Sequence, residues 1–278
     1  MRYVIAHGHI FKNAGSTFDW SLRQNFEDAF LDHRDDKAMR QLGARHVEEV
    51  LRLSPELKAL SSHHLCMPLP EMEECTILPV YLLRHPIVRI ESVYDFERGQ
   101  VASTPGASAA KKLSFASYTQ WRMRADVAPT IRNYQTIYLA GLHNSPQASR
   151  GNSLADFGRA MKTLREAPLI GIVERYDESM VVMEDKLQAF FPGIDLSYVR
   201  QNVSKKRNSV SFNKRVARIL NRLGDSQATV LDSNALDMAI YQLSNSRLDE
   251  AVAEIEDFPA RLESFQKRCV QHHQAVNN

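Results

Sequence analysis

The chain has 278 residues, of which 44% are hydrophobic and 24% are charged, so it can bury a large core as an ordinary globular protein. The net charge of +2 excludes an overall field that would favour nucleic acid, and an anion site therefore has to come from local clustering. Its 3 cysteines lack metal or redox spacing, and neither a signal peptide nor a membrane span is expected, which favours a cytoplasmic protein without a metal site.

The first predicted unit is a strand, a tight loop and a helix. Tyr3 to Ile5 are apolar and β-prone, whereas the apolar residues from Phe18 to Phe26 have the spacing of a helix face. The loop between them consists of Lys12, Asn13, Ala14, Gly15, Ser16 and Thr17. A helix N-terminus presents backbone N–H groups and a positive dipole end, Gly15 permits close approach of a ligand, and Lys12 adds a charge. The loop is therefore either a phosphate site, although not a Walker A motif, or an ordinary strand-to-helix turn.

The next stretch, residues 28 to 58, has the apolar spacing of a helix. Within it, the charge run from Asp32 to Arg40 is expected to form an exposed loop or turn. Two adjacent histidines, His63 and His64, follow before Pro68 interrupts regular structure. Adjacent residues of an extended segment point to opposite sides, so only one of these histidines can face a ligand.

A second strand, loop and helix begin with the continuous apolar run from Thr76 to Leu83, which is typical of a buried parallel strand. Helical spacing begins after Pro86. Arg84 is therefore expected at the carboxyl end of a strand, where open α/β sheets bind ligands, and Ser92 two turns into the helix. A guanidinium can form a forked pair with a phosphate, and a hydroxyl can donate to it.

Residues 99 to 112 are rich in small residues, and we interpret them as a mobile loop that is either an active-site lid or a plain connection. Asn133 and Gln135 either contact an acceptor or serve in capping and core hydrogen bonds. Leu154 to Glu166 is predicted to be an amphipathic helix with an N-terminal cap formed by Ser153 and Asp156.

The last third of the chain begins with a buried strand from Leu169 to Val173. A basic loop then contains Ser204, Lys205 and Arg207. Four cations along one helix either attract an anion or form a solvated face. These cations are Lys214, Arg215, Arg218 and Arg222. From Leu236 the chain is predicted to be helical to about His272, with residues 271 to 278 as a frayed tail.

Several blocks of the sequence resemble sulfotransferases that use 3′-phosphoadenosine 5′-phosphosulfate (PAPS), in their Golgi-type and bacterial carbohydrate branch, near the 2-O-sulfotransferases. Residues 12–17 resemble the family's 5′-phosphosulfate loop, Lys-x-x-Gly-Thr/Ser-Thr/Ser. Residues 83–94 resemble its 3′-phosphate motif, with His85 in place of the family's aspartate. Residues 170–179 are similar to Val-Gly-x-x-Glu-Arg-Phe-Asp-Glu-Ser, and residues 237–243 to a late Asp-x-x-x-Tyr block.

The resemblance implies an α/β fold in which a central parallel sheet of about four or five strands is flanked by helices, as in P-loop kinases. It implies one domain over residues 1–278 and in-line transfer of the sulfuryl group of PAPS to a hydroxyl, first of all that of a carbohydrate, with a lipid or small alcohol as alternatives. The family's Golgi relatives carry an N-terminal anchor; none is evident here, which favours a bacterial cytoplasmic protein.

The resemblance also implies roles for individual residues. Lys12 would neutralise the oxygen that leaves with adenosine 3′,5′-bisphosphate, and the loop up to Thr17 would hold the 5′-phosphate. Arg84 and Ser92 would bind the 3′-phosphate. The basic loop would close over the nucleotide through Ser204, Lys205 and Arg207.

The general base is expected to be His64, because that residue falls on the histidine that the family places beside the sulfate. His9, at the end of the first strand, is its main competitor. Two other functions stay open. A nucleotide-dependent kinase on the same sheet needs a Walker loop, which is missing, and a catalytically inactive nucleotide-binding or interaction protein would have no need to keep this set of residues.

Overall fold

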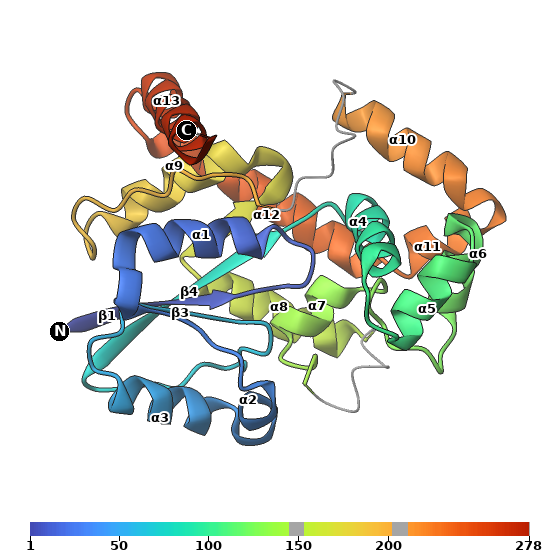
Figure 1. Cartoon of the computed structure of the whole chain (residues 1–278), viewed down its shortest axis with the longest axis horizontal. Coiled ribbons are helices and arrows are strands. Elements are labelled where there is room, and N and C mark those ends of the chain that lie inside the picture. The colour runs from blue at the N-terminus through green and yellow to red at the C-terminus, as the bar shows by residue number, and fades with distance from the viewer. Residues whose placement is uncertain (145–152, 202–210, 278) are drawn as a thin grey trace. The chain divides into compact units, whose positions relative to one another are not determined.

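The computed structural model describes residues 1–144, 153–201 and 211–277, which form two compact units (Figure 1). Unit 1 is built from the described residues of Met1–Leu83, Met161–Val203 and Gln242–Asn278, and unit 2 from those of Arg84–Ala160 and Ser204–Tyr241. Among the helices that the structure describes, none has both the length and the apolar character needed to cross a bilayer.

Unit 1 contains a five-stranded sheet in the order β2-β3-β1-β4-β5, and all neighbouring strands run parallel. The strands are β1 (Arg2–Gly8), β2 (Phe30–Asp32), β3 (Ala59–Ser62), β4 (Cys75–Leu83) and β5 (Leu169–Ile172). Helices flank the sheet, so the predicted α/β fold with a central parallel sheet is confirmed.

Helices cover both faces of this sheet (Figure 1). Successive strand residues point to opposite faces, so Ile5 packs into one core while its neighbours Val4 and Ala6 pack into the other. The first core is closed by α1 (Gly15–Phe26), α9 (Tyr176–Leu187) and α13 (Phe258–Asn277). The second core is closed by α2 (Asp36–Leu42) and α3 (Ala44–Leu53). Short helical turns, η1 (Glu27–Ala29) and η3 (Val173–Arg175), join elements of this unit.

The strand order places a topological switch between β1 and β4. After β1 the chain builds β2 and β3 on one side of it, and then returns to build β4 and β5 on the other side. Ligands of open α/β sheets bind at the carboxyl ends of strands at such a switch. The loop after β1 lies at this edge, because the side-chain amide of Asn13 donates to the carbonyl of Leu82 near the end of β4, at 2.7 Å.

The described residues of unit 2 form helices joined by loops. Its helices are α4 (Pro86–Gly99), α5 (Pro105–Lys112), α6 (Phe115–Met123), α7 (Tyr134–Leu139), α10 (Phe212–Leu223), η4 (Gly224–Ser226) and α11 (Gln227–Asp232). Two longer helices, α8 (Leu154–Glu166) and α12 (Ala235–Glu254), run from one unit into the other. The predicted cap of α8 is confirmed, since the hydroxyl of Ser153 accepts from the amide of Asp156 at 3.1 Å.

The interpretation of residues 99–112 as a mobile loop is wrong for most of that stretch. Thr104 caps the N-terminus of α5 through its side chain, Pro105 occupies the first turn, and the small residues Ala107 and Ala110 are fully buried. Alanine favours helices, and its small side chain lets α5 pack closely on α4. Residues 105–112 therefore form an ordered helix rather than a mobile loop.

Three other boundaries differ from the prediction. Strand β2 and helix α2 occupy most of the charge run that was expected to be an exposed loop. The C-terminal helical region is broken into α12 and α13 at Asp257, whose φ of 49° is left-handed. Helix α13 continues to Asn277, so the expected tail is helical as far as that residue.

Candidate functional site

The loop between β1 and α1 has a strained backbone. Lys12 and Ala14 adopt left-handed conformations, with φ of 65° and 62°, although neither is glycine. Such a conformation costs on the order of 1 kcal/mol or more per residue and persists only where the surroundings impose it. Here Asn13 imposes it, because its backbone amide donates to the carbonyl of Ile10 at 3.1 Å and its side chain is fixed to β4. The loop is thus held in one shape at the switch between β1 and β4.

The N-terminus of α1 is not capped by a side chain. Its N-cap residue is Ala14, which has no side-chain oxygen, so the first N–H groups of the helix lack the usual capping acceptor. Ser16 is exposed, whereas Thr17 is buried and accepts a hydrogen bond from the amide of Gln201 at 3.3 Å. Backbone donors and the positive end of the helix dipole make this terminus suited to an anion.

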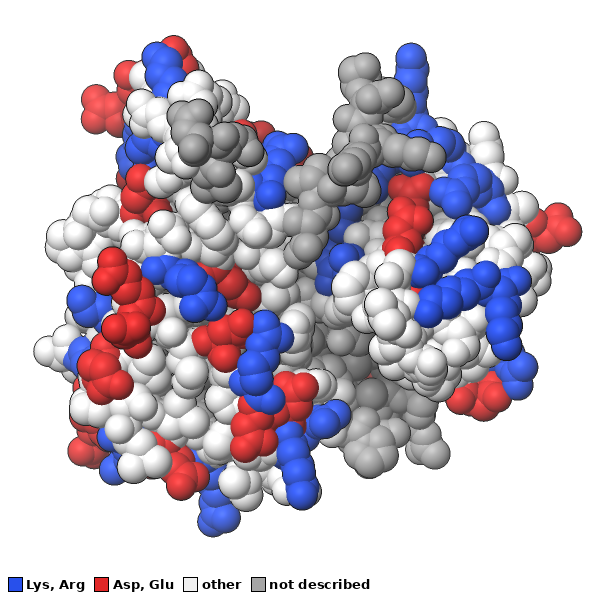
Figure 2. Space-filling model, in the orientation of Figure 1, with Lys and Arg blue, Asp and Glu red and all other residues white. Residues whose placement is uncertain are grey.

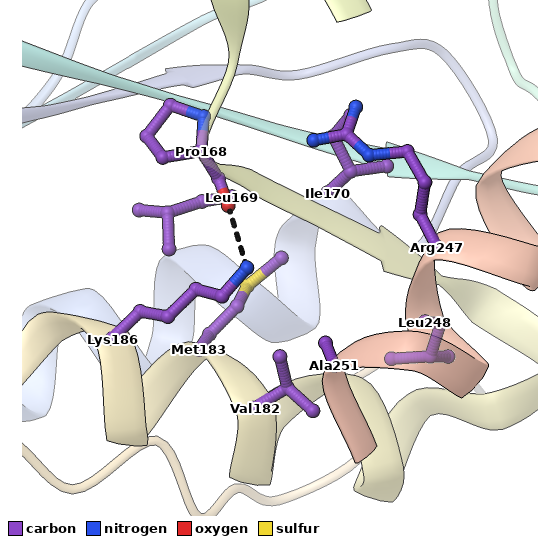
Figure 3. A pocket seen from close by; sticks show the side chains of 9 residues that line it. All are labelled: Pro168, Leu169, Ile170, Val182, Met183, Lys186, Arg247, Leu248 and Ala251. Atoms are coloured by element: carbon purple, nitrogen blue, oxygen red, sulfur yellow. Dashed lines mark hydrogen bonds between the residues drawn. The ribbon is translucent and has the colours of Figure 1, made fainter. Parts of the chain in front are cut away.

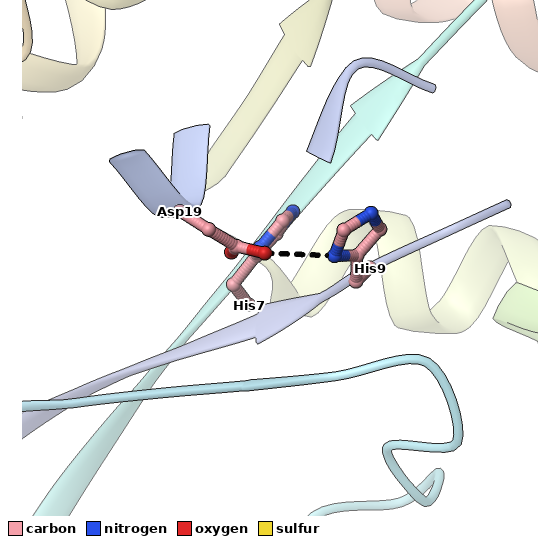
Figure 4. Close-up of side chains that lie close together, drawn as sticks. All are labelled: His7, His9 and Asp19. Atoms are coloured by element: carbon pink, nitrogen blue, oxygen red, sulfur yellow. Dashed lines mark hydrogen bonds and ion pairs between the residues drawn. The ribbon is translucent and has the colours of Figure 1, made fainter. Parts of the chain in front are cut away.

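Asp19 binds two histidines beside this helix terminus (Figure 4). His7 lies in β1, His9 directly follows the last residue of that strand, and Asp19 lies in α1. Nδ1 of His7 lies 2.7 Å from Oδ1 of Asp19, and Nδ1 of His9 lies 2.8 Å from Oδ2. Nδ1 of His7 also lies 3.0 Å from Oγ of Ser61. All three ionisable side chains are at least nine-tenths buried.

The electrostatics of the cluster favour an ionised aspartate and a neutral His7. Burial acts to raise the pKa of Asp19, but the adjacent His7 and His9 overcome it and hold that pKa well below its usual range. Burial lowers the pKa of His7, although Asp19 opposes the effect. An ionised carboxylate can only accept, so Nδ1 of each ring donates to it, and Nε2 of the neutral His7 ring keeps its lone pair.

The ring of His9 leaves room only for glycine at position 15. A β-carbon at position 15 would lie 2.3 Å from Cδ2 and 2.4 Å from Nε2 of the His9 ring, which is closer than atoms can approach. Because Asp19 fixes this ring, it has little freedom to move away. The imidazole edge that carries Nε2 therefore lies directly against the first residue of α1. Glycine at position 15 therefore makes room for the His9 ring, in addition to the room that it leaves for a ligand.

His63 and His64 point in different directions, and His63 is the one that reaches the cluster. Nδ1 of His63 lies 3.0 Å from the carbonyl of His9, and the two rings are 4.0 Å apart. Burial and then proximity to His9 lower the pKa of His63 to about 4. Nε2 of His64 instead lies 3.7 Å from Asp36 on α2, and its side chain is 24% exposed. Of the two, His63 is therefore the one that contacts His9, and the role of His64 as general base stays a prediction.

In unit 2, the backbone of Arg84 is fixed by Gln135. The side-chain amide of Gln135 accepts from the amide of Arg84 at 2.8 Å and donates to its carbonyl at 2.9 Å. Asp237 in turn accepts from the amides of Gln135 and Thr136, at 3.1 and 2.7 Å. Arg84 is 5% exposed, and Gln135 is fully buried. Gln135 therefore has the core hydrogen-bonding role that was one of its two expected alternatives.

Other residues named from the sequence are placed as follows. Ser92 is half-buried in α4. Asn133, the N-cap residue of α7, accepts from the amide of Asp237 at 3.1 Å. Ser204, Lys205 and Arg207 lie outside the described residues.

The cations of α10 bind a carboxylate of their own unit. Arg215, Arg218 and Arg222 approach the buried side chain of Glu91 on α4, at 3.2, 3.0 and 2.7 Å. In Figure 2, Lys and Arg side chains gather over α10. These arginines are therefore neither a purely solvated face nor an unengaged anion site, because they attach α10 to α4.

A cavity elsewhere in unit 1 does not involve any of these residues. It is a partly open pocket of about 320 Å³, open solvent included, beside β5 and between α9 and α12 (Figure 3). Its two cations are engaged by backbone oxygens: Lys186 donates to Pro168 at 3.4 Å, and Arg247 donates to Leu164 and Ala167. The other residues that line this pocket are apolar, so they offer no group for catalysis.

Among the described residues, His7 and Asp19 are the site residues that sequence reasoning did not select. His7 was visible as the partner of His9 two positions along a strand. Asp19 carried no signal of its own, because one aspartate in a helix is usually solvated.

Comparison with known proteins shows one similarity over most of the chain. No protein-family model matches. An uncharacterized protein of Archaeoglobus fulgidus is 28% identical over 247 residues, which span 87% of this chain and 95% of that protein. The similarity therefore extends over both units.

Proposed function

We propose that the protein transfers the sulfuryl group of PAPS to a hydroxyl acceptor, with a carbohydrate as the first candidate. The observation that carries the proposal is the position of Nε2 of His9 against Gly15, at the uncapped N-terminus of α1. This position places a basic nitrogen beside a helix N-terminus, which is the element best suited to bind an anionic group. The resemblance of residues 12–17 to a phosphosulfate loop supports the same assignment.

His9 is the proposed general base. Asp19 fixes Nδ1–H of the ring, so Nε2 is the basic nitrogen, and the carboxylate stabilises the imidazolium that forms when Nε2 takes a proton. His64, which the resemblance selects, is the alternative. Its ring lies 3.7 Å from Asp36, which is longer than the distance between His9 and Asp19, and its side chain is 24% exposed.

The reaction forms a bond between the acceptor oxygen and sulfur and breaks the bond between sulfur and the oxygen of the 5′-phosphate. Nε2 of His9 accepts the hydroxyl proton and releases it later to solvent. Lys12, in the strained loop, neutralises the charge that develops on the departing oxygen. The first amides of α1, together with Ser16 and Thr17, hold the 5′-phosphate. PAPS supplies only the activated sulfuryl group.

Arg84 and Ser92 are the proposed ligands of the 3′-phosphate. Gln135 binds both the amide and the carbonyl of Arg84, so the direction in which the side chain leaves the backbone is fixed. The resemblance adds Ser204, Lys205 and Arg207 to this group. A guanidinium with a fixed origin binds phosphate with less loss of entropy than a mobile one.

Two other functions are weighed against this proposal. A kinase on the same sheet would need a Walker loop, and the sequence has none. An inactive nucleotide-binding or interaction protein would have no reason to retain a buried His–Asp pair and a strained loop beside one helix terminus.

The experiment is a transfer assay with sulfur-labelled PAPS and separate pools of glycans and small alcohols. Label that appears in a product of either pool, and is lost in His9→Ala, supports the proposal. If both pools stay unlabelled while the protein transfers phosphate from γ-labelled ATP, the kinase is the correct assignment.

A further inference from the structure

The cluster of His7, His9 and Asp19 also has the composition of a metal site. One ligand atom from each of the three side chains lies within 4.8 Å of the others (Figure 4). Two histidines and one carboxylate are a common set of protein ligands for zinc, with further positions left for water. The side chains come from two rigid elements, β1 and α1, so the set is built into the fold.

The geometry of the cluster suits a cation. The buried carboxylate of Asp19 faces one nitrogen of each imidazole, at 2.7 and 2.8 Å. Carboxylate oxygen and imidazole nitrogen are ligands that zinc accepts together. A divalent ion would meet ligands that are already largely desolvated.

We propose that His7, His9 and Asp19 bind a divalent transition-metal ion of the zinc type. A tetrahedral ion with bonds of about 2.0–2.2 Å holds its ligand atoms roughly 3.3–3.6 Å apart. In the structure, Nδ1 of His7 and Oδ1 of Asp19 are 2.7 Å apart, and no two of the three ligand atoms are more than 4.8 Å apart. The separation that a tetrahedral ion requires lies within this range. Side-chain adjustments are enough to admit the ion.

Imidazole nitrogen excludes the common hard cations. Magnesium and calcium prefer oxygen ligands, and the cluster offers one carboxylate. Zinc, cobalt and nickel accept imidazole and carboxylate together. The proposal therefore commits to this group of ions and predicts no measurable magnesium binding.

Metal binding and the hydrogen bonds to Asp19 are mutually exclusive. A metal bound at Nδ1 takes the position of the ring proton, which moves to Nε2 of the same imidazole. Nε2 of His7 is buried and has no hydrogen-bond partner among the described residues, so its new proton stays unsatisfied. This cost limits the affinity, and the ion is expected to bind reversibly. While it is bound, His9 has no basic nitrogen left for catalysis.

The test uses the metal-free full chain titrated with Co²⁺, whose visible absorption reports tetrahedral nitrogen and oxygen ligands, and with Zn²⁺ by calorimetry. We expect one site, no heat with Mg²⁺, and a loss of affinity of at least about 100-fold in Asp19→Asn. The matched control is His46→Gln. Its ring nitrogen lies 2.9 Å from that of His33, so this second pair is the main competing site, and the variant should bind like the wild type.

A measurement on the wild-type chain covers the case in which Asp19→Asn does not fold. In protein with ¹⁵N-labelled histidine, Zn²⁺ should move the ring proton of His7 and His9 from Nδ1 to Nε2, as seen in two-bond nitrogen–proton spectra. Binding that is lost in His46→Gln, or rings of His7 and His9 that keep their Nδ1 proton at saturating Zn²⁺, would overturn the proposal. None of these readouts depends on sulfuryl transfer.

Discussion

Nδ1 of His9 lies 2.8 Å from Oδ2 of Asp19, and the other oxygen of the same carboxylate binds His7. The pair is buried at the end of β1, and its ring rests against the first residue of α1. Three features that the proposed function uses therefore coincide at one point: an oriented imidazole, a carboxylate that can stabilise its charged form, and a helix terminus suited to anions.

The first prediction separates the two candidate bases. His9→Ala should lower the turnover of PAPS by roughly 10²- to 10⁴-fold, the usual effect of removing a general base, with little change in nucleotide affinity. His64→Ala should keep most of the activity, because the ring of this histidine is partly exposed and lies 3.7 Å from Asp36 on α2. Steady-state kinetics, with calorimetry for the nucleotide, measure both effects. If His64→Ala is the inactive variant and His9→Ala is active, the assignment from family resemblance is correct and ours is wrong.

A second prediction concerns Gly15. Gly15→Ala should destabilise the protein by about 1–3 kcal/mol, as overpacking does, and should shift the ring signals of His9, because the added methyl occupies the place of that ring. Gly158→Ala is the matched control. Its β-carbon meets nothing within 4 Å in the middle of α8, so it should be neutral or stabilising by up to about 1 kcal/mol. Chemical unfolding and the NMR spectrum of His9 test the pair. A Gly15→Ala variant of native stability with unchanged His9 signals would show that the ring has room to move.

Stability should fall between neutral and mildly acidic pH. Burial lowers the pKa of His63 and of His85 to about 4, and it also lowers the pKa of His7. The unfolded chain therefore takes up protons first as the pH drops below about 6.5, which favours unfolding until the folded-state pKa is reached. The free energy of unfolding in urea should be lower at pH 5 than at pH 7.5, and His63→Asn should reduce the difference. Equal values at the two pH values in the wild type would contradict the burial of these rings.

The attachment of α10 to α4 depends on one carboxylate. Glu91→Ala would leave three arginines facing one another, and it should destabilise the protein by about 3 kcal/mol, at the lower end of the range for a broken buried pair because the arginines are partly exposed. Glu48→Ala, which removes a surface pair with Arg52 on α3, should cost less than about 0.5 kcal/mol. Equal effects of the two changes in urea unfolding would contradict a structural role of Glu91.

The main lines of the fold followed from periodicity. Continuous apolar runs predicted β1, β4 and β5, and the capping pair predicted the start of α8. Strand β2 was missed because it has three residues at the edge of the sheet, too few to show a pattern. Helix α5 was missed although Thr104 and Pro105 are a recognisable helix start, because its small residues resembled a loop.

The site was predicted less completely than the fold. The loop and its helix were expected, but the partner of His9 was not, because Asp19 reaches it only when α1 turns back over the end of β1. The resemblance selected His64, and the alternation of an extended chain was used to argue that only one of the two histidines can face a ligand. However, β3 ends at Ser62 and both histidines lie in the turn that follows. Alternation holds within a strand and gives no direction beyond its last residue.

The proposed function depends on a nucleotide with a 3′-phosphate. Arg84→Ala should remove a charge-assisted contact worth about 1.5–3 kcal/mol, which corresponds to roughly ten- to a hundredfold in affinity. Arg98→Ala is the control, because this arginine lies at the far end of α4, the helix that follows Arg84, and is exposed, where it donates to Tyr94 at 2.9 Å. It should bind nucleotides like the wild type.

The most direct test is a calorimetric comparison of adenosine 3′,5′-bisphosphate, adenosine 5′-phosphate and ATP on the wild-type protein. The bisphosphate should bind at least about ten times more tightly than the other two nucleotides, and Arg84→Ala should abolish this preference. Equal affinity for the bisphosphate and the monophosphate, or a preference for ATP, would contradict the assignment of the protein as a PAPS-dependent sulfotransferase.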